Sequence, residues 1–428
     1  MALNSPTTYS PIFDRPAHQR CCNSAKSIRN ATDAQYRSAI FGPWYWFAVW
    51  TGMLVPVKET SNKFFLLVQF LPNALSTIIL LIRANYFVFQ MGNAHALTLE
   101  WAKLQVIFFT ALHGFISCAI LTTFKRGRFV EKMVQYMRNA SLNRMSKAPI
   151  QAFFSKIIVV LILVIPVLIY VMQVWLTFND TFSFLSTPEG WQNASAEAKN
   201  GYRLSLAINI VDSILVIWGT IPSAAVLILY LLANATVCRE YRYFRKEFKA
   251  HVKDGTITQL HIIKSFQSQL IDFLTAACYL NNVANGILNI TFMAGLMCQI
   301  ASQYALHSYS SELTPIQLAW FSFALAQSIA FLVYSMRRPG LLQNELTKTT
   351  YLVMLDQGIW QKSDDALVKR IAKNIAARLK SVDYTVKGAF SSKAANTVFI
   401  AVMIIIPFFV NILAGYKPIS EPTNSTSH

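Results

Sequence analysis

The stretch NTVFIAVMIIIPFFVNILAGY, residues 396–416, contains no charged side chain between Lys393 and Lys417. A helix needs roughly 20 mostly apolar residues to cross the hydrocarbon core of a bilayer. Six other stretches of the chain also meet this requirement. The sequence therefore predicts an all-α integral membrane protein with seven transmembrane helices, at about residues 64–88, 101–123, 153–177, 205–236, 273–302, 316–336 and 395–415.

The composition agrees with this fold class. Of the 428 residues, 54% are apolar and 14% are charged, whereas a soluble domain is about a quarter charged. Residues 1–36 lack the apolar run of a cleavable signal peptide, so the first span is expected to direct insertion.

An eighth apolar run, IFGPWYWFAVWTGMLVPV at 40–57, is shorter and rich in tryptophan. Gly42-Pro43 interrupts it and Pro56 closes it. Tryptophan and tyrosine favour the headgroup level of a bilayer. We therefore expect an interfacial helix here, within a cytoplasmic N-terminal region of residues 1–63.

Basic residues are concentrated on one side of the predicted spans. Of the 38 lysines and arginines, 33 lie before the first span or in the second, fourth and sixth connections. Short loops rich in Lys and Arg stay in the cytoplasm. The pattern places the N-terminus inside and the C-terminus outside, with a short extracellular tail at 416–428.

The sixth connection predicts a cytoplasmic helical anchor at about 340–392. An apolar residue recurs every three or four positions along it, which is typical of an amphipathic helix. This stripe is expected either to lie on the inner leaflet or to pack against inner helices of the same or another subunit. Its members are Leu367, Ile371, Ile375, Leu379, Val382 and Val386.

Two kinds of covalent modification fit this topology. Glycosylation sequons at Asn179, Asn193 and Asn424 fall on the outer side. Cys21, Cys22 and Cys238 lie near the inner face, where they are either palmitoylation sites or unmodified thiols. No cysteine falls in a predicted outer segment, so no extracellular disulfide is expected.

The sequence contains no motif of the common enzyme classes: no GxxxxGK[ST], HExxH, GxSxG or CxxC. We expect His113, in the second span, to be a hydrogen-bonded packing residue rather than a metal ligand. The chain is therefore predicted not to be an enzyme and to need no cofactor or metal. Its expected partners are membrane lipid and a small organic ligand, not nucleic acid.

Polar side chains inside the spans are the first candidates for a binding site, because each must avoid lipid. Asp212 either forms an interhelical hydrogen bond or contacts a ligand or ion. Asn282, Asn285 and Asn289 share one face of the fifth span. This face either holds helices together or forms the wall of a ligand cavity.

Aromatic residues gather in the outer halves of the third to sixth spans. A mostly apolar, aromatic cavity with few polar groups suits a small organic ligand, although rings at this depth also serve packing. Together with Asp212 and Asn285 they make up the predicted ligand pocket: Tyr170, Trp175, Trp218, Tyr304, Trp320 and Phe321.

The last span is apolar with isolated polar residues, which is compatible with a pore closed by dewetting at an apolar constriction. It is equally compatible with a lipid-facing anchor. The predicted pore-lining residues are Asn396, Thr397, Ile404, Ile405, Phe408 and Asn411.

This layout resembles the insect-type gustatory and odorant receptor superfamily. The similarity rests on TGMLVPV (51–57), CREYRYFRKEF (238–248) and SQLIDFLTAACYLNNVANGILN (268–289). The order of inner helix, short break (GAFSSK, 388–393), final span and short tail is also similar. The last-span signature of the superfamily, Thr-Tyr, five apolar residues and Gln-Phe, is not kept. If Asn411 replaces the glutamine, Ile404-Ile405 replace Thr-Tyr, which indicates a divergent member from a nematode or other non-insect lineage.

The resemblance implies a ligand-gated, non-selective cation channel in the plasma membrane of sensory neurons. It implies a homo- or hetero-tetramer whose final spans line the pore and whose subunits each hold an outward-facing pocket. Related invertebrate proteins sense tastants, and some respond to light or heat.

Two other classes of membrane protein remain open. A serpentine G-protein-coupled receptor also has seven helices, but its N-terminus is outside, against the charge bias. A transporter would need several buried charges, whereas Asp212 is nearly alone inside the spans.

Overall fold

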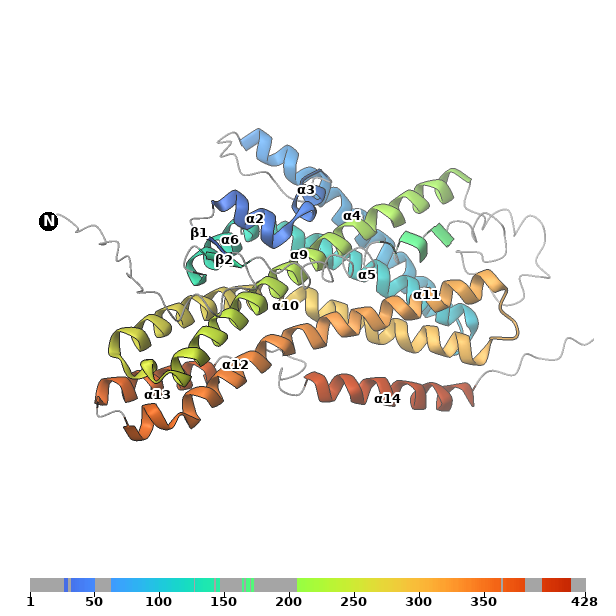
Figure 1. Cartoon of the computed structure of the whole chain (residues 1–428). Helices are drawn as coiled ribbons and strands as arrows, with labels where there is room; N and C mark the ends of the chain where they lie inside the picture. The colour runs from blue at the N-terminus through green and yellow to red at the C-terminus, as the bar shows by residue number, and fades with distance from the viewer. Residues whose placement is uncertain are drawn as a thin grey trace, which may run out of the picture.

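The computed structural model of the chain describes residues 27–29, 32–50, 63–126, 128–141, 144–146, 206–362, 365–381 and 395–416, together with 164, 167–169, 171 and 172. Within these ranges the protein is almost entirely helical (Figure 1). The helices are α2 (Asp33–Phe41), α3 (Pro43–Trp50), α4 (Lys63–Asn93), α5 (Leu99–Arg126), α6 (Phe129–Ala140), α9 (Leu206–Lys253), α10 (Leu260–Ser308), α11 (Pro315–Leu332), α12 (Arg338–Leu355), α13 (Ala366–Ser381) and α14 (Ala395–Ala414).

Shorter elements join or accompany these helices. A 3₁₀ turn, η2 (Thr256–Thr258), lies between α9 and α10, and two π-helical segments are η3 (Val333–Arg337) and η4 (Gly358–Lys362). Strands β1 (Ser27–Arg29) and β2 (Arg144–Ser146) form an antiparallel pair.

Five helical stretches of the described chain are long and apolar enough to cross a membrane. They run over Leu99–Phe124, Ile221–Lys253, Leu260–Ser308, Pro315–Gln361 and Thr397–Ala414, and α4 adds a shorter apolar stretch at Asn73–Phe89. A helical protein with several apolar helices is therefore confirmed. The predicted third span, 153–177, lies almost entirely outside the described residues.

Two helices are much longer than a span. α9 has 48 residues and α10 has 49, which makes each about 70 Å long at 1.5 Å per residue, against roughly 30 Å of hydrocarbon. Gly255, with φ of +67°, permits the tight turn between them. At one end of Figure 1 this turn lies beside α13 and the end of α12, so the long helices extend from the bundle of apolar helices into a second helical bundle.

The anchor predicted at 340–392 is divided into two helices in its described part, α12 and α13. The break follows Asp356, whose carboxylate accepts hydrogen bonds from the backbone N–H groups of Gly358 (3.4 Å) and Ile359 (3.1 Å). The buried stripe of α13 contains Ile371, Ile375 and Leu379 as expected. Leu367 was wrongly included, since it is 51% exposed and Val368 is buried instead.

Contacts far apart in sequence fix the first helix against the bundle. Asp33 of α2 pairs with Arg138 of α6 at 2.9 Å. The Tyr36 hydroxyl lies 2.7 Å from the Ser141 hydroxyl, at the end of the same helix. Gly42, with φ of +56°, then turns the chain from α2 into the tryptophan-rich α3. Residues 51–57 of the predicted interfacial helix lie outside the described residues.

Candidate ligand pocket

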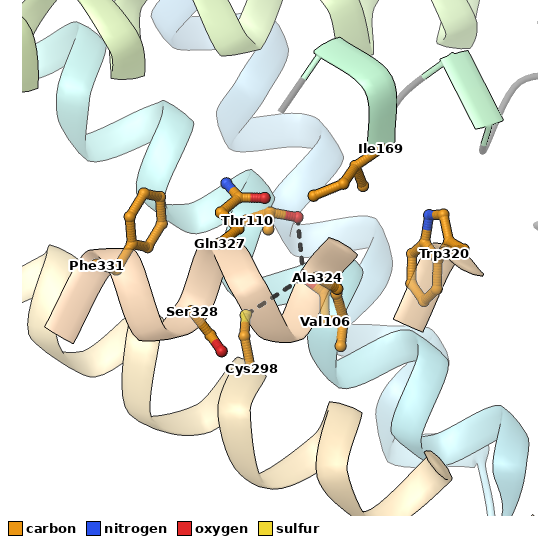
Figure 2. Close-up of a pocket in the computed structure, with 9 residues that line it drawn as sticks. All are labelled: Val106, Thr110, Ile169, Cys298, Trp320, Ala324, Gln327, Ser328 and Phe331. Atoms are coloured by element: carbon orange, nitrogen blue, oxygen red, sulfur yellow. Dashed lines mark hydrogen bonds between the residues drawn. The ribbon is translucent and has the colours of Figure 1, made fainter. Parts of the chain in front are cut away.

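A small pocket lies between α5, α10 and α11, with Ile169 on its remaining side (Figure 2). Trp320 and Phe331, three turns apart on α11, stand at its two ends in the figure. The space open to the centre of a water molecule is about 10 Å³, which is room for about one water. The lining residues are Val106, Thr110, Ile169, Cys298, Trp320, Ala324, Gln327, Ser328 and Phe331.

Most polar groups of the pocket are occupied by backbone carbonyls. The Thr110 hydroxyl lies 2.9 Å from the carbonyl oxygens of Val106 and Ile107, and the Cys298 thiol donates to Val106 O at 3.8 Å. The Ser328 hydroxyl donates to Leu325 O at 2.7 Å. The Gln327 amide makes no hydrogen bond to any residue that the structure describes. The pocket is thus apolar with one amide available to a polar group of a ligand.

The helices that form the pocket approach closely at Gly295 of α10. A Cβ at this position would lie 3.0 Å from Phe331 Cβ and 3.0 Å from the Ser328 carbonyl oxygen. Only glycine lets the two backbones approach so closely here. Gly295 therefore holds two pocket residues of α11 directly against α10.

Phe331 connects the pocket to the polar interior of the bundle. Its ring stacks on His113 of α5, with centroids 4.6 Å apart and planes at 24°. His113 is 2% exposed, and its Nε2 lies 3.0 Å from the Thr291 hydroxyl of α10. This agrees with the hydrogen-bonded packing role expected for His113.

The π-helical segment η3 begins two residues after Phe331. A π-turn leaves carbonyls of the preceding helix without their usual donors, and the Ser335 hydroxyl compensates by lying 2.8 Å from Phe331 O and 3.3 Å from Leu332 O. Met336, 1% exposed, packs in one cluster with Phe292 of α10. The same cluster includes Val398, Phe399 and Val402 of α14, so η3 packs against the last helix.

The last helix packs through one face only. Of the side chains described in α14, only Ile406 and Val410 are buried. The opposite face is uncovered, with Ile404 67%, Ile405 59% and Phe408 67% exposed. An isolated subunit therefore leaves most of an apolar helix without a protein neighbour.

The chain matches, over residues 40–410, the family described as Caenorhabditis protein of unknown function, DUF267. It belongs to this family. The match agrees with the expectation of a nematode lineage. No curated protein sequence matches the DUF267 chain.

Solved structures share the fold of the DUF267 chain. The insect olfactory receptor OR5 from Machilis hrabei superposes with a TM-score of 0.62 at 10% identity, covering 87% of this chain and 99% of the receptor. The same receptor in complex with eugenol superposes with a TM-score of 0.60 at 10% identity. This superposition covers 86% of this chain and 100% of the receptor. The resemblance to the insect-type gustatory and odorant receptor superfamily is therefore confirmed in the fold.

The structure places three of the predicted pocket residues in one apolar cluster: Tyr304, Trp320 and Phe321. Trp320 lines the pocket and meets Phe321 edge to face, with centroids 4.8 Å apart. Tyr304 is fully buried in the same apolar cluster but does not line the pocket. Its hydroxyl donates to Leu97 O at 2.6 Å, and that of Tyr309 donates to the same oxygen at 2.8 Å.

The remaining predicted pocket residues lie elsewhere or outside the described part. Asn285 lies 19 residues before Tyr304 on α10, about 28 Å along the helix. Asp212 and Trp218 belong to α9, where their side chains are not described, and Tyr170 and Trp175 lie outside the described residues. Asn282 is exposed, and Asn285 and Asn289 are partly buried.

The predicted pore residues whose side chains are described all lie on the uncovered face of α14. Thr397 and Asn411 are exposed, as are Ile404, Ile405 and Phe408. Asn396 is in the helix, but its side chain is not described. Among the modification sites, Cys238 is 6% exposed and donates to Asn234 Oδ1 at 3.5 Å. Asn179, Asn193, Asn424, Cys21 and Cys22 lie outside the described residues.

Sequence reasoning missed Gln327 and Phe331 of the DUF267 chain. Gln327 is a polar residue in the middle of an apolar run, and this signal alone could have identified it. Phe331 had no comparable signal, because its role depends on the stack with His113, 218 positions away in the sequence.

Proposed function

We propose that this chain is a chemosensory receptor of the gustatory type that acts as a ligand-gated, non-selective cation channel. The main support is the fold, which it shares along 99% of the length of an olfactory receptor. Both of these structures are of a receptor, which also supports the expectation that the chain is not an enzyme.

In this proposal the ligand is a small, mostly apolar organic molecule that binds between α5, α10 and α11. The apolar walls and the Gln327 amide suit a molecule with one hydrogen-bonding group. OR5 has been solved in complex with the small organic molecule eugenol. Because the pocket holds about one water in this state, the ligand would have to displace side chains such as Trp320 or Phe331.

The pore is formed by the uncovered face of α14 from several subunits. A tetramer that places this face around a central axis would cover or hydrate Ile404 and Phe408, which the isolated chain leaves exposed. Large apolar side chains are also exposed on α12, where Tyr351 is 60% and Leu355 76% exposed, and on α13, where Leu367 is 51% exposed. We assign these side chains to contacts between the cytoplasmic anchors of neighbouring subunits.

The topology proposed for the receptor has seven spans, a cytoplasmic N-terminus and an extracellular C-terminus, in the plasma membrane of sensory neurons. The distribution of basic residues supports the orientation. The fold shared with OR5 favours this class over a G-protein-coupled receptor or a transporter.

The orientation is tested by staining a C-terminal epitope tag on intact cells. Staining without permeabilisation supports the proposed topology, and a parallel N-terminal tag should stain only after permeabilisation. The reverse pattern would exclude the channel-type arrangement and favour a serpentine receptor.

A further inference from the structure

Three arginines on α9, at positions 239, 242 and 245, follow the apolar run that ends at Val237. Each places its Nε against a carboxylate. Arg239 Nε lies 3.1 Å from Glu240 Oε1, Arg242 Nε lies 3.3 Å from Glu345 Oε1, and Arg245 Nε lies 2.9 Å from Glu345 Oε2. These ion pairs fix the direction of all three guanidinium groups.

Glu345 of α12 is the centre of this cluster. Its side chain is 7% exposed, and Lys348 Nζ lies 3.7 Å from Oε1. Nearby, the Tyr241 hydroxyl donates to the Thr349 hydroxyl at 2.9 Å and ties α9 to α12 a second time. The cations are therefore held by packed helices rather than by mobile loops.

Positive charge exceeds negative charge within the cluster. It consists of Arg239, Arg242, Arg245, Lys348, Glu240 and Glu345. Among these described side chains, four cations face two carboxylates, an excess of two positive charges. Arg239 is 11% exposed, Arg245 25%, Arg242 33% and Lys348 57%, so the excess charge is partly open to solvent.

Hydrogen-bond donors of the cluster are also left over. Arg239 Nη2 is buried without an acceptor among the described residues. The Nη groups of Arg242, whose side chain is 33% exposed, have no partner there either. Guanidinium groups with two free N–H donors bind phosphate oxygens in a bidentate manner.

We propose that this cluster, the α9–α12 arginine site, binds a phosphomonoester group, supplied by a phosphorylated phospholipid of the inner leaflet. A phosphomonoester carries about −1.5 to −2 charge near neutral pH, which matches the excess of two. Its place directly after the apolar run of α9 puts the site at headgroup depth, where basic clusters recognise anionic lipids. The inference rests on the proposed orientation but not on channel activity.

The test is lipid retention by the purified full-length protein, measured by native mass spectrometry after exchange into detergent. The probes are phosphatidylinositol 4-phosphate, phosphatidylserine and phosphatidylcholine at equal concentration. We expect selective retention of the phosphomonoester lipid. Arg239→Gln with Arg242→Gln should weaken it roughly thirtyfold, from about 1 kcal/mol per basic residue near the surface and about 1.4 kcal/mol per tenfold change.

The matched control is Arg378→Gln with Lys380→Gln, which removes the same charge from the exposed face of α13 and should leave retention unchanged. If the double arginine variant proves unstable, Lys348→Gln takes its place. The Lys348 side chain is 57% exposed, so this substitution should weaken lipid retention without a loss of folding. Soluble inositol 1,4,5-trisphosphate distinguishes a lipid from a soluble phosphate ester as the source of the bound group. If the protein retains this compound as well as it retains the lipid, the site is assigned to a free phosphate ester. Equal retention of all three lipids, or unchanged retention in both arginine-site variants, would overturn the proposal.

Discussion

Phe331 and His113 form a stacked pair, with ring centroids 4.6 Å apart, that joins the wall of the pocket to the buried polar contact between α5 and α10. Phe331 comes from α11, His113 from α5, and the hydroxyl near His113 from Thr291 of α10. One ring pair therefore connects the three helices that surround the proposed ligand.

His113→Phe should keep the stack and lose the hydrogen bond to Thr291. A buried hydroxyl left without its partner costs about 1–3 kcal/mol, so the melting temperature in detergent should fall. Thr291→Val removes the other partner, and the double variant should be less destabilised than the sum of the two single changes. Additive losses would mean that the two side chains do not interact.

Gly295→Ala should force α10 and α11 apart, because the new Cβ would lie 3.0 Å from Phe331 Cβ and from Ser328 O. Overpacking of this kind costs typically about 1–3 kcal/mol. Gly92→Ala is the matched control, since a Cβ at Gly92 meets nothing within 4 Å. Equal melting temperatures for the Gly295 and Gly92 variants would contradict the close approach.

Gln327→Leu should reduce the response to ligands that carry a hydrogen-bonding group, since it replaces the free amide of the pocket. One neutral hydrogen bond is worth about 0.5–1.5 kcal/mol, or up to roughly a tenfold change in half-maximal concentration. The measurement is a current response to a panel of small organic compounds. Loss of response to every compound, polar or apolar, would instead indicate a folding defect, which surface staining detects.

Tyr241→Phe should remove the hydrogen bond to Thr349 and cost about 1 kcal/mol. Burial raises the pKa of the Tyr241 phenol, so the folded state keeps it protonated. The unfolded chain ionises near pH 10, and the advantage of the wild type should therefore be complete below pH 10 and decline above it. Tyr351→Phe, at a ring 60% exposed, should leave the melting temperature at neutral pH unchanged. If the difference in unfolding free energy between wild type and Tyr241→Phe stayed constant up to pH 11, the buried, protonated Tyr241 would be contradicted.

Helix positions were predictable because apolar runs and charge steps are local properties of the sequence. The final helix begins and ends as its uncharged run implies, and its predicted pore residues with described side chains share one uncovered face. The extension of α9 beyond its span was also predictable from its helical pattern, but its contacts were not: Arg242 and Arg245 pair with Glu345 of α12, which is far away in the sequence.

The pocket was only partly predictable. Trp320 was identified from its type and depth, but a ring at that depth is as readily a packing residue, as Tyr304 proved to be. Which helices meet, and at which residue, depends on contacts such as Gly295 with Phe331, which no periodicity in a single segment reveals.

A ligand-independent leak tests most directly whether α14 lines a pore closed by apolar side chains. Ile404→Ser with Phe408→Ser should hydrate the constriction, because such gates close by dewetting. We expect proteoliposomes with this variant to release potassium without any ligand, whereas proteoliposomes with the wild-type protein should retain it. Phe89→Ser is the control, at an α4 ring 69% exposed, close to the 67% of Phe408. No leak from the folded double variant, or an equal leak from Phe89→Ser, would contradict a pore at α14.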